Sequence, residues 1–188
     1  MRLFLAINPP DHIREEIVAV TSALRQAGPS LRWVAADRLH LTVRFLGEQP
    51  AERLAKVAAA VDTAVSRHAG TPLTLAGFGA FPNFRRARVV WVGVEPHPRL
   101  ELLHHDVEHA CVQLGFEPEG RAFRPHLTLA RVPDGTTEEV LRAVAREARA
   151  TRYRAEIEVD SVDLMASEPS PEGSRYRIIH ASPLHAAA

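Results

Sequence analysis

The sequence of 188 residues predicts an α+β fold: a bilobal, pseudo-twofold duplication in which two antiparallel sheets line a central cleft and helices cover the outer faces. Three observations support this prediction. Apolar residues recur with strand-like and helix-like periods in alternating segments. The tripeptide His-Leu-Thr occurs twice, at 40–42 and 126–128. The segments around the two copies follow one another in the same order, which indicates an internal repeat.

The first half of the chain contains both element types. A proline pair opens a helix at about 10–27, which Gly28 closes, and a second helix is expected at about 51–67. The alternating segments that predict strands are 2–7, 31–34, 39–46, 72–80 and 87–95. The last two are expected to form a hairpin.

The second half repeats this order. Helices are expected at about 98–114 and at 136–149, where Thr136 and Glu139 form a capping box. The strands expected here are 123–131, 154–165 with a bulge near residues 160–161, and 175–181.

A single offset relates the halves, because His126 lies 86 residues after His40. The same offset places Arg38 on Arg124 and strand 2–7 on 88–93. We therefore expect one domain, 1–188, with two lobes. One lobe would come from the central segment, about 39–115, and the other from both terminal segments.

Each copy of the tripeptide places an imidazole and a hydroxyl on one face of a strand, because strand side chains alternate with period two. If the strands are neighbours, two imidazoles and two hydroxyls face one cleft. A phosphodiester fits such a site, since it needs two proton-transfer partners and several neutral donors. One strand histidine is more often a structural, hydrogen-bonded residue. The repetition favours the catalytic interpretation.

The composition is that of an ordinary globular protein, with 46% apolar residues and a formal net charge of zero. Any RNA binding must therefore come from a local patch. Cys111 is the only cysteine, so no intrachain disulfide can form. The apolar stretch at residues 2–7 is too short for a signal peptide, and prolines follow it at once. No apolar run approaches the length of a membrane span. We expect a cytoplasmic protein without membrane contact.

Three longer stretches include or accompany the two motifs. They are HLTVRFLGE at 40–48, RPHLTLAR at 124–131, and GAFP at 79–82 followed by RVVWVGV at 88–94. In these stretches the chain resembles the 2H phosphoesterase superfamily. Within it, the chain is similar to the LigT-like RNA 2′,3′-cyclic phosphodiesterases, also called 2′-5′ RNA ligases. The resemblance covers nearly the whole chain. It implies hydrolysis of RNA 2′,3′-cyclic phosphates to 2′-phosphates without a metal or another cofactor, and reversible 2′-5′ RNA joining.

The resemblance also implies roles for the motif residues. It makes His40 the proton donor to the leaving 3′ oxygen and His126 the proton acceptor that activates water. Thr42 and Thr128 would bind the phosphate through their hydroxyls, although β-propensity alone also explains threonine on a strand. The resemblance favours Arg131 as a phosphate contact; its parity differs from that of His126, and a solvated surface arginine is an equal alternative.

Other residues are candidate RNA contacts. Arg44 shares the parity of His40 and is expected to face the cleft, while Arg38 and Arg124 precede the motif strands and would line its rim. Phe84, followed by two arginines on a hairpin tip, and Phe123 combine aromatic and cationic groups as single-stranded RNA platforms do. A solvated turn and a core phenylalanine explain these two residues equally well.

The segment HDVEH at 105–109 resembles a zinc-binding helix, but the expected glutamate position holds Asp106 and no third ligand is evident, so we expect no metal. The expected partners are RNA 3′ ends bearing a 2′,3′-cyclic phosphate, tRNA fragments among them, and the expected state is a monomer. Two alternatives stay open: a phosphodiesterase acting on 2′-5′ oligonucleotides or small cyclic nucleotides, and a non-catalytic RNA-end binding module.

Overall fold

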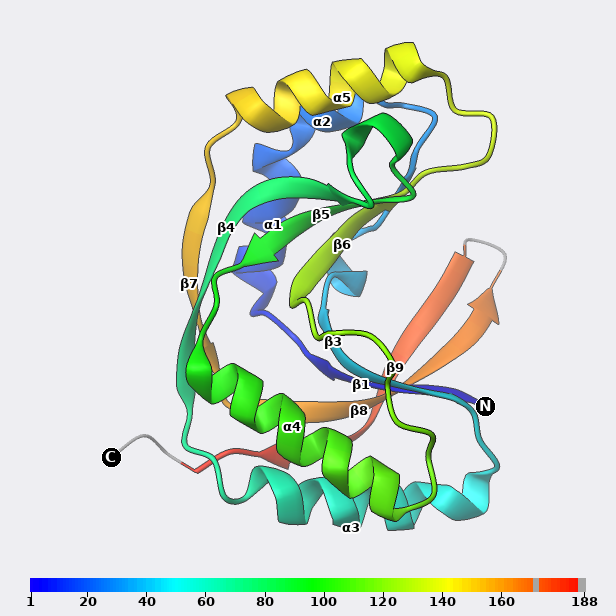
Figure 1. The fold of residues 1–188 in the computed structure, drawn as a ribbon, viewed down its shortest axis with the longest axis vertical. Coiled ribbons are helices and arrows are strands. Elements are labelled where there is room, and N and C mark those ends of the chain that lie inside the picture. Colours follow the sequence, from blue (N-terminus) through cyan, green and yellow to red (C-terminus); the bar gives the residue numbers. More distant parts are fainter. Residues whose placement is uncertain (171–172, 186–188) are drawn as a thin grey trace.

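The computed structural model describes residues 1–170 and 173–185 (Figure 1). The strands are β1 Arg2–Ile7, β2 Arg32–Trp33, β3 Leu41–Glu48, β4 Thr71–Phe81, β5 Val89–Val94, β6 His126–Arg131, β7 Arg154–Val159, β8 Ser161–Ser170 and β9 Gly173–Pro183. The helices are α1 Asp11–Val20, α2 Ser22–Ala27, α3 Leu54–Val65, α4 Pro98–Gln113 and α5 Glu138–Ala150. Short 3₁₀ turns are η1 Ala36–Arg38, η2 Ala51–Arg53 and η3 Phe84–Arg86. In the described ranges no helix is both long and apolar enough to cross a membrane.

The strand order confirms the predicted α+β fold and its pseudo-twofold arrangement. In the described part of the chain the nine strands form one curved sheet in the order β7-β4-β5-β6-β3-β1-β8-β9, with β2 beside β6, and all paired strands are antiparallel. The central pair β3 and β6 is flanked by β1 and β5, and then by β8 and β4. The expected two sheets are therefore two halves of one sheet. The halves are joined where β3 pairs with β6, at Leu41 and Leu127.

The helices cover opposite ends of this sheet. Figure 1 shows α2 and α5 together at one end and α3 and α4 together at the other. The main core lies between the sheet and the helices and takes buried residues from both halves, including Leu41 and Leu127, both fully buried. Burying each such leucine stabilises the fold by roughly 1.5–3 kcal/mol, so the junction of the two motif strands is anchored firmly.

The two halves of the sheet divide the chain at other residues than expected. Strands β4 to β7, which span 71–159, lie on one side of the central junction, and β1, β3, β8 and β9 lie on the other. The expected segment, about 39–115, is wrong at both ends because β3 pairs with β1 and β6 pairs with β5. The motif strands meet at the centre, so each must belong to a different half.

Three local expectations are also corrected. The single strand expected at 154–165 is two strands, because β7 pairs with β4 and β8 with β1, and Asp160 lies where the chain crosses between them. The cap of α5 is Thr137, whose hydroxyl accepts a hydrogen bond from the Val140 backbone N–H at 3.4 Å. The helix expected at 10–27 is interrupted at Thr21, whose hydroxyl donates to the Ile17 carbonyl at 2.7 Å. The Thr21 backbone N–H also donates to the Ile17 carbonyl, at 3.1 Å, and such back-bonding of a threonine hydroxyl often bends a helix.

Both motif strands contain a bulge at the equivalent residue. Between β1 and β3, Leu5 lies opposite Arg44 and Ala6 opposite Thr42, so Val43 is left over. Between β5 and β6 the residue left over is Leu129, which lies 86 residues after Val43. An extra residue reverses the alternation of side chains beyond it. The bulges therefore decide which arginines share a face with the histidines.

Candidate active site

The two histidines lie at the junction of the two sheet halves. His40 immediately precedes β3, and His126 is the first residue of β6. Because Leu41 lies opposite Leu127, the antiparallel register places His40 opposite Thr128 and Thr42 opposite His126. The two leucines point into the core, so these four polar residues leave the other face. The sequence-predicted quartet is thus brought together in one place.

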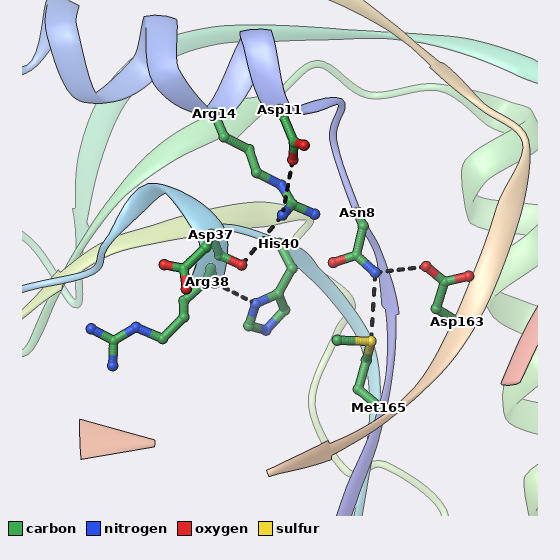
Figure 2. Close-up of polar contacts among 8 residues, drawn as sticks. All are labelled: Asn8, Asp11, Arg14, Asp37, Arg38, His40, Asp163 and Met165. Carbon is green, nitrogen blue, oxygen red and sulfur yellow. Dashed lines mark hydrogen bonds and ion pairs between the residues drawn. The ribbon is translucent and has the colours of Figure 1, made fainter. Parts of the chain in front are cut away.

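A backbone carbonyl orients each imidazole. His40 Nδ1 lies 2.8 Å from the Arg38 carbonyl oxygen, and His126 Nδ1 lies 2.6 Å from that of Arg124 (Figure 2 shows the first). A carbonyl oxygen only accepts, so Nδ1 carries the proton in both rings. Proton exchange is therefore left to Nε2 in both histidines. The backbone carbonyl two residues before each histidine therefore has the same role in both copies of the repeat.

Aromatic rings enclose both histidines. His40 lies 4.9 Å from the Phe4 ring and 5.3 Å from the Tyr176 ring, measured between ring centroids. His126 lies 4.9 Å from the Phe81 ring and 6.4 Å from Trp91. These contacts fix the ring planes and reduce the water around them. Both rings are half-buried.

Burial is the largest influence on both titrations. It lowers the pKa of His40 and of His126 below the ordinary 6.5, while the carbonyls of Arg38 and Arg124 oppose that shift. Positive charges on Arg14, Arg131 and His126 lower the pKa of His40 further. The two histidines therefore differ, because only His40 is under the influence of two arginines.

The bulges exchange the expected positions of two arginines. Arg131 lies beyond the Leu129 bulge and opposite Val89, which places it on the same face as Thr128 and His126. It is exposed at the end of β6. The parity conflict noted in the sequence thus disappears in the structure. An exposed guanidinium on the histidine face, close enough to affect His40, suits a phosphate.

Arg44 does not face the cleft, so that prediction is wrong. The Val43 bulge turns it to the opposite face, where it is 4% exposed. Its guanidinium pairs with the Glu108 carboxylate of α4 and donates to the Glu117 carbonyl. Arg44 thus attaches the 115–121 loop to α4 and is unavailable to RNA. Its Nε has no partner among the described residues.

Arg14 is a site residue that the sequence analysis missed. It extends from α1 toward His40, as Figure 2 shows, and its side chain is 13% exposed. Its Nη1 donates to the Asp37 carbonyl at 3.3 Å and lies 3.7 Å from the Asp11 carboxylate. The available signal was its position between Ile13 and Ile17, the buried residues of α1. A cation on the apolar side of a helix requires a partner or a function.

The remaining candidates differ in their surroundings. The Arg38 guanidinium donates to the Ser174 carbonyl at 3.2 Å, whereas the exposed Arg124 lies beside His126. Phe84 is half-buried and packs against α5 residues in a small apolar cluster, which supports the core interpretation. Phe123 stacks on the His104 ring at 3.9 Å.

A cavity of about 310 Å³ adjoins His126. Its walls include Phe81, Trp91, Leu100, Glu101, Phe123 and Arg124. The offset of 86 residues relates Leu100 to Arg14 and Phe123 to Asp37, so polar groups stand at the corresponding positions beside His40. The cavity therefore adjoins the site on the side of His126.

The helix segment 105–109 uses its acidic residues structurally. Glu108 pairs with Arg44, and the Asp106 carboxylate lies 2.9 Å from His68 Nε2. Within residues 1–170 and 173–185, no three histidine, cysteine or acidic side chains are grouped so that they could hold a metal ion.

Comparisons with known proteins agree on one family. The model of the 2′-5′ RNA ligase superfamily matches residues 9–170. The chain is 31% identical over 179 residues to the RNA 2′,3′-cyclic phosphodiesterase of Methanocaldococcus jannaschii, covering 95% of this chain and 98% of that one. It is 40% identical over 133 residues to the Escherichia coli protein of that name, covering 69% and 71%.

Solved structures agree with this result. A crystal structure from Thermus thermophilus matches with a TM-score of 0.81 at 27% identity over 100% of both chains. Escherichia coli LigT complexed with 3′-AMP matches with a TM-score of 0.74 at 31% identity over 97% of both. The resemblance inferred from the two His-Leu-Thr motifs is thereby confirmed. The chain belongs to the 2′-5′ RNA ligase superfamily, among the LigT-like 2H phosphoesterases.

Proposed function

We propose that this enzyme opens the 2′,3′-cyclic phosphate at RNA 3′ ends to a 2′-phosphate, with two histidines as acid and base and without a metal ion. The names of its relatives and the shared fold support cyclic phosphodiesterase activity. The observation that carries the mechanism is the pair of imidazoles. Each has Nδ1 committed to a carbonyl and Nε2 free, across the Leu41–Leu127 junction.

In this proposal, His126 Nε2 takes a proton from a water molecule as its oxygen attacks phosphorus. The bond between phosphorus and the 3′ oxygen breaks, and protonated His40 gives its Nε2 proton to that oxygen. The product carries a 2′-phosphate and a 3′-hydroxyl. Each proton transfer is worth roughly 10²–10⁴ in rate.

The other residues of the site would stabilise the phosphate. The Thr42 and Thr128 hydroxyls donate to the non-bridging oxygens, and Arg131 and Arg14 balance the charge that develops on them. The bound anion also offsets the arginine charges that lower the pKa of His40. Substrate binding thus raises the protonated fraction of the acid.

A second activity, reversible 2′-5′ joining, is favoured by the cavity beside His126. The attacking oxygen in our mechanism lies on this side, and a 5′-hydroxyl can replace water there. Phe123, which lines this cavity, suits the base of the incoming nucleotide. The product would be a 2′-5′ phosphodiester with a free 3′-hydroxyl.

Product analysis tests the proposed function. RNA ending in a 2′,3′-cyclic phosphate is incubated with the protein and EDTA, and the phosphate position is read by chromatography. We expect a 2′-phosphate only, and losses of roughly 10²–10⁴ in kcat for His40→Ala and His126→Ala. His12→Ala, at an exposed position of α1, is the matched control. Unchanged turnover in both active-site variants with weaker RNA binding would favour the binding-module alternative, and faster cleavage of 2′-5′ oligonucleotides would favour the other alternative.

A further inference from the structure

We propose that a basic groove between η3 and α5 binds the RNA strand that leads in the 5′ direction from the cyclic phosphate. The inference rests on the function proposed above and extends it to the body of the substrate. We call this surface the arginine groove and define it by its four exposed arginines, Arg85, Arg86, Arg142 and Arg149.

The groove is large and positively charged. A cavity of about 720 Å³ between η3 and α5 is lined by these four arginines and by one carboxylate, that of Glu138. In the described part of the chain, Arg85, Arg86 and Arg149 have no carboxylate within 4.0 Å, and Arg142 has only Glu138 at 3.8 Å. The protein has a formal net charge of zero, so this excess of cations over carboxylates is local. Phosphates of an RNA strand are the ligand that such a groove suits.

The arginines of η3 stand on a fixed turn. The Asn83 side-chain oxygen accepts the backbone N–H groups of Arg85 at 2.9 Å and Arg86 at 3.2 Å. Phe84 anchors the turn in the apolar cluster that contains Leu141 of α5. The backbone that carries these cations is thus fixed before a ligand arrives, which reduces the backbone entropy lost on binding.

The arginine groove continues toward the candidate active site. A second cavity, of about 510 Å³, is lined by Arg85, Arg149 and Trp91. The Trp91 ring lies against Gly79, where an added Cβ would come within 2.2 Å of the ring, so the indole covers the strand surface. Trp91 also borders the cavity beside His126. An aromatic side chain next to a cationic groove is the arrangement that binds single-stranded nucleic acid without sequence preference.

The duplication supplies an internal comparison. The offset of 86 residues relates α5 to α3 and places Lys56 and Thr63 where Arg142 and Arg149 stand. The arginine groove therefore has no counterpart of similar charge on α3. An RNA end that carries a cyclic phosphate continues only in the 5′ direction, so it needs one such path. The charge asymmetry of the two halves matches the polarity of that substrate.

The test compares substrates of different length. KM is measured for a 2′,3′-cyclic mononucleotide and for a six-nucleotide RNA with a 2′,3′-cyclic phosphate end. The variant Arg85→Glu/Arg149→Glu should raise KM for the six-nucleotide RNA roughly tenfold or more and flatten its salt dependence by roughly 0.7 in the log–log slope per lost phosphate contact. KM for the mononucleotide should change less than about twofold, because it cannot reach the groove.

The control carries the same change in charge. Lys56→Glu/Arg67→Glu alters two exposed cations in or just beyond α3 and should leave both KM values unchanged. Equal effects of the two double variants, or no effect of the first on the longer RNA, would overturn the inference. If the wild-type protein turns over neither substrate, the proposed function fails. In that case, binding of 2′-phosphate-ended RNA to the wild type and to both double variants is measured by fluorescence anisotropy. Loss of binding in Arg85→Glu/Arg149→Glu alone supports the arginine groove. Equal binding by all three proteins overturns it.

Discussion

Replacing Arg44 by methionine tests whether Arg44 stabilises the fold or binds the substrate. The side chains of Arg44 and Glu108 are 3% and 19% exposed, so the substitution leaves a largely buried carboxylate without its cation. Breaking a buried pair costs roughly 3–5 kcal/mol, and the partial exposure of Glu108 puts our expectation at about 3 kcal/mol. For a chain of this length that corresponds to a decrease in Tm of roughly 6–12 °C.

The assay combines stability with kinetics. Thermal unfolding followed by circular dichroism should show the lower Tm for Arg44→Met, while KM for cyclic-phosphate RNA at a temperature where both proteins are folded stays unchanged. The double variant Arg44→Met/Glu108→Leu should recover most of the lost stability, since no charge is left buried alone. Arg2→Met is the surface control, because Arg2 is 69% exposed. A wild-type Tm for Arg44→Met together with a raised KM would refute the assignment of the Val43 bulge.

Three further predictions follow from the same geometry. Arg131→Met should lower kcat/KM for cyclic-phosphate RNA by roughly 10²-fold while Tm stays within about 2 °C, because an exposed side chain is lost from the phosphate site; equal kcat/KM would remove Arg131 from the site. The alkaline limb of the kcat/KM profile should lie below pH 6.5, since burial and two arginines lower the pKa of His40 in the free enzyme. The alkaline limb of the kcat profile should lie at higher pH, because the bound anion offsets the arginine charges. Stopped-flow profiles in which the kcat limb lies at the lower pH would contradict this. Burial raises the pKa of Cys111 to about 11, so a thiol reagent at pH 8 should label it only in denaturant; rapid labelling of the folded protein would be the contrary result.

The pH dependence of stability has a definite sign. Folded His40 and His126 have pKa values below 6.5, so below that pH the unfolded chain binds more protons than the folded one. The stabilisation from keeping these rings neutral is complete above pH 6.5 and is lost as the pH falls through the folded values. His40→Gln should therefore lose less stability than the wild type between pH 7 and pH 5, as measured by urea unfolding. An equal loss in both proteins would show that other groups dominate acid unfolding.

The sequence predicted the strands and motifs that occur in both halves, and it missed the β-bulges that interrupt them. Alternation and the offset of 86 residues located the motif strands, and the quartet of His40, Thr42, His126 and Thr128 came together as expected. A bulge adds one residue to a strand without any compositional mark, and Val43 and Leu129 look like ordinary strand residues. Simple alternation of side chains therefore placed Arg44, and not Arg131, on the face of the histidines.

Other misses have similarly local causes. Arg14 belongs to no motif, because its role arises only where α1 packs beside His40. The break at Asp160 depends on β7 and β8 choosing partners in different halves of the sheet, which is a tertiary property. Thr136 and Thr137 offer competing caps one residue apart, and Thr136 instead donates to the Pro133 carbonyl at 2.8 Å. Local sequence could not rank these two threonines.

A duplicated site must lose its symmetry before its two histidines can have opposite roles, because identical surroundings would give identical pKa values. The structure places that loss at equivalent residues. Arg131 corresponds to Phe45, which is 60% exposed, and Arg14 corresponds to the buried Leu100. Both cations lower the pKa of His40, and in the proposed mechanism a bound phosphate offsets them, so that His40 is protonated when it acts as the acid. His126 lacks both influences and faces the open cavity from which a nucleophile can enter. In the proposed mechanism the direction of the reaction therefore depends on these two differences between the repeats, while His40, Thr42, His126 and Thr128 are the same in both.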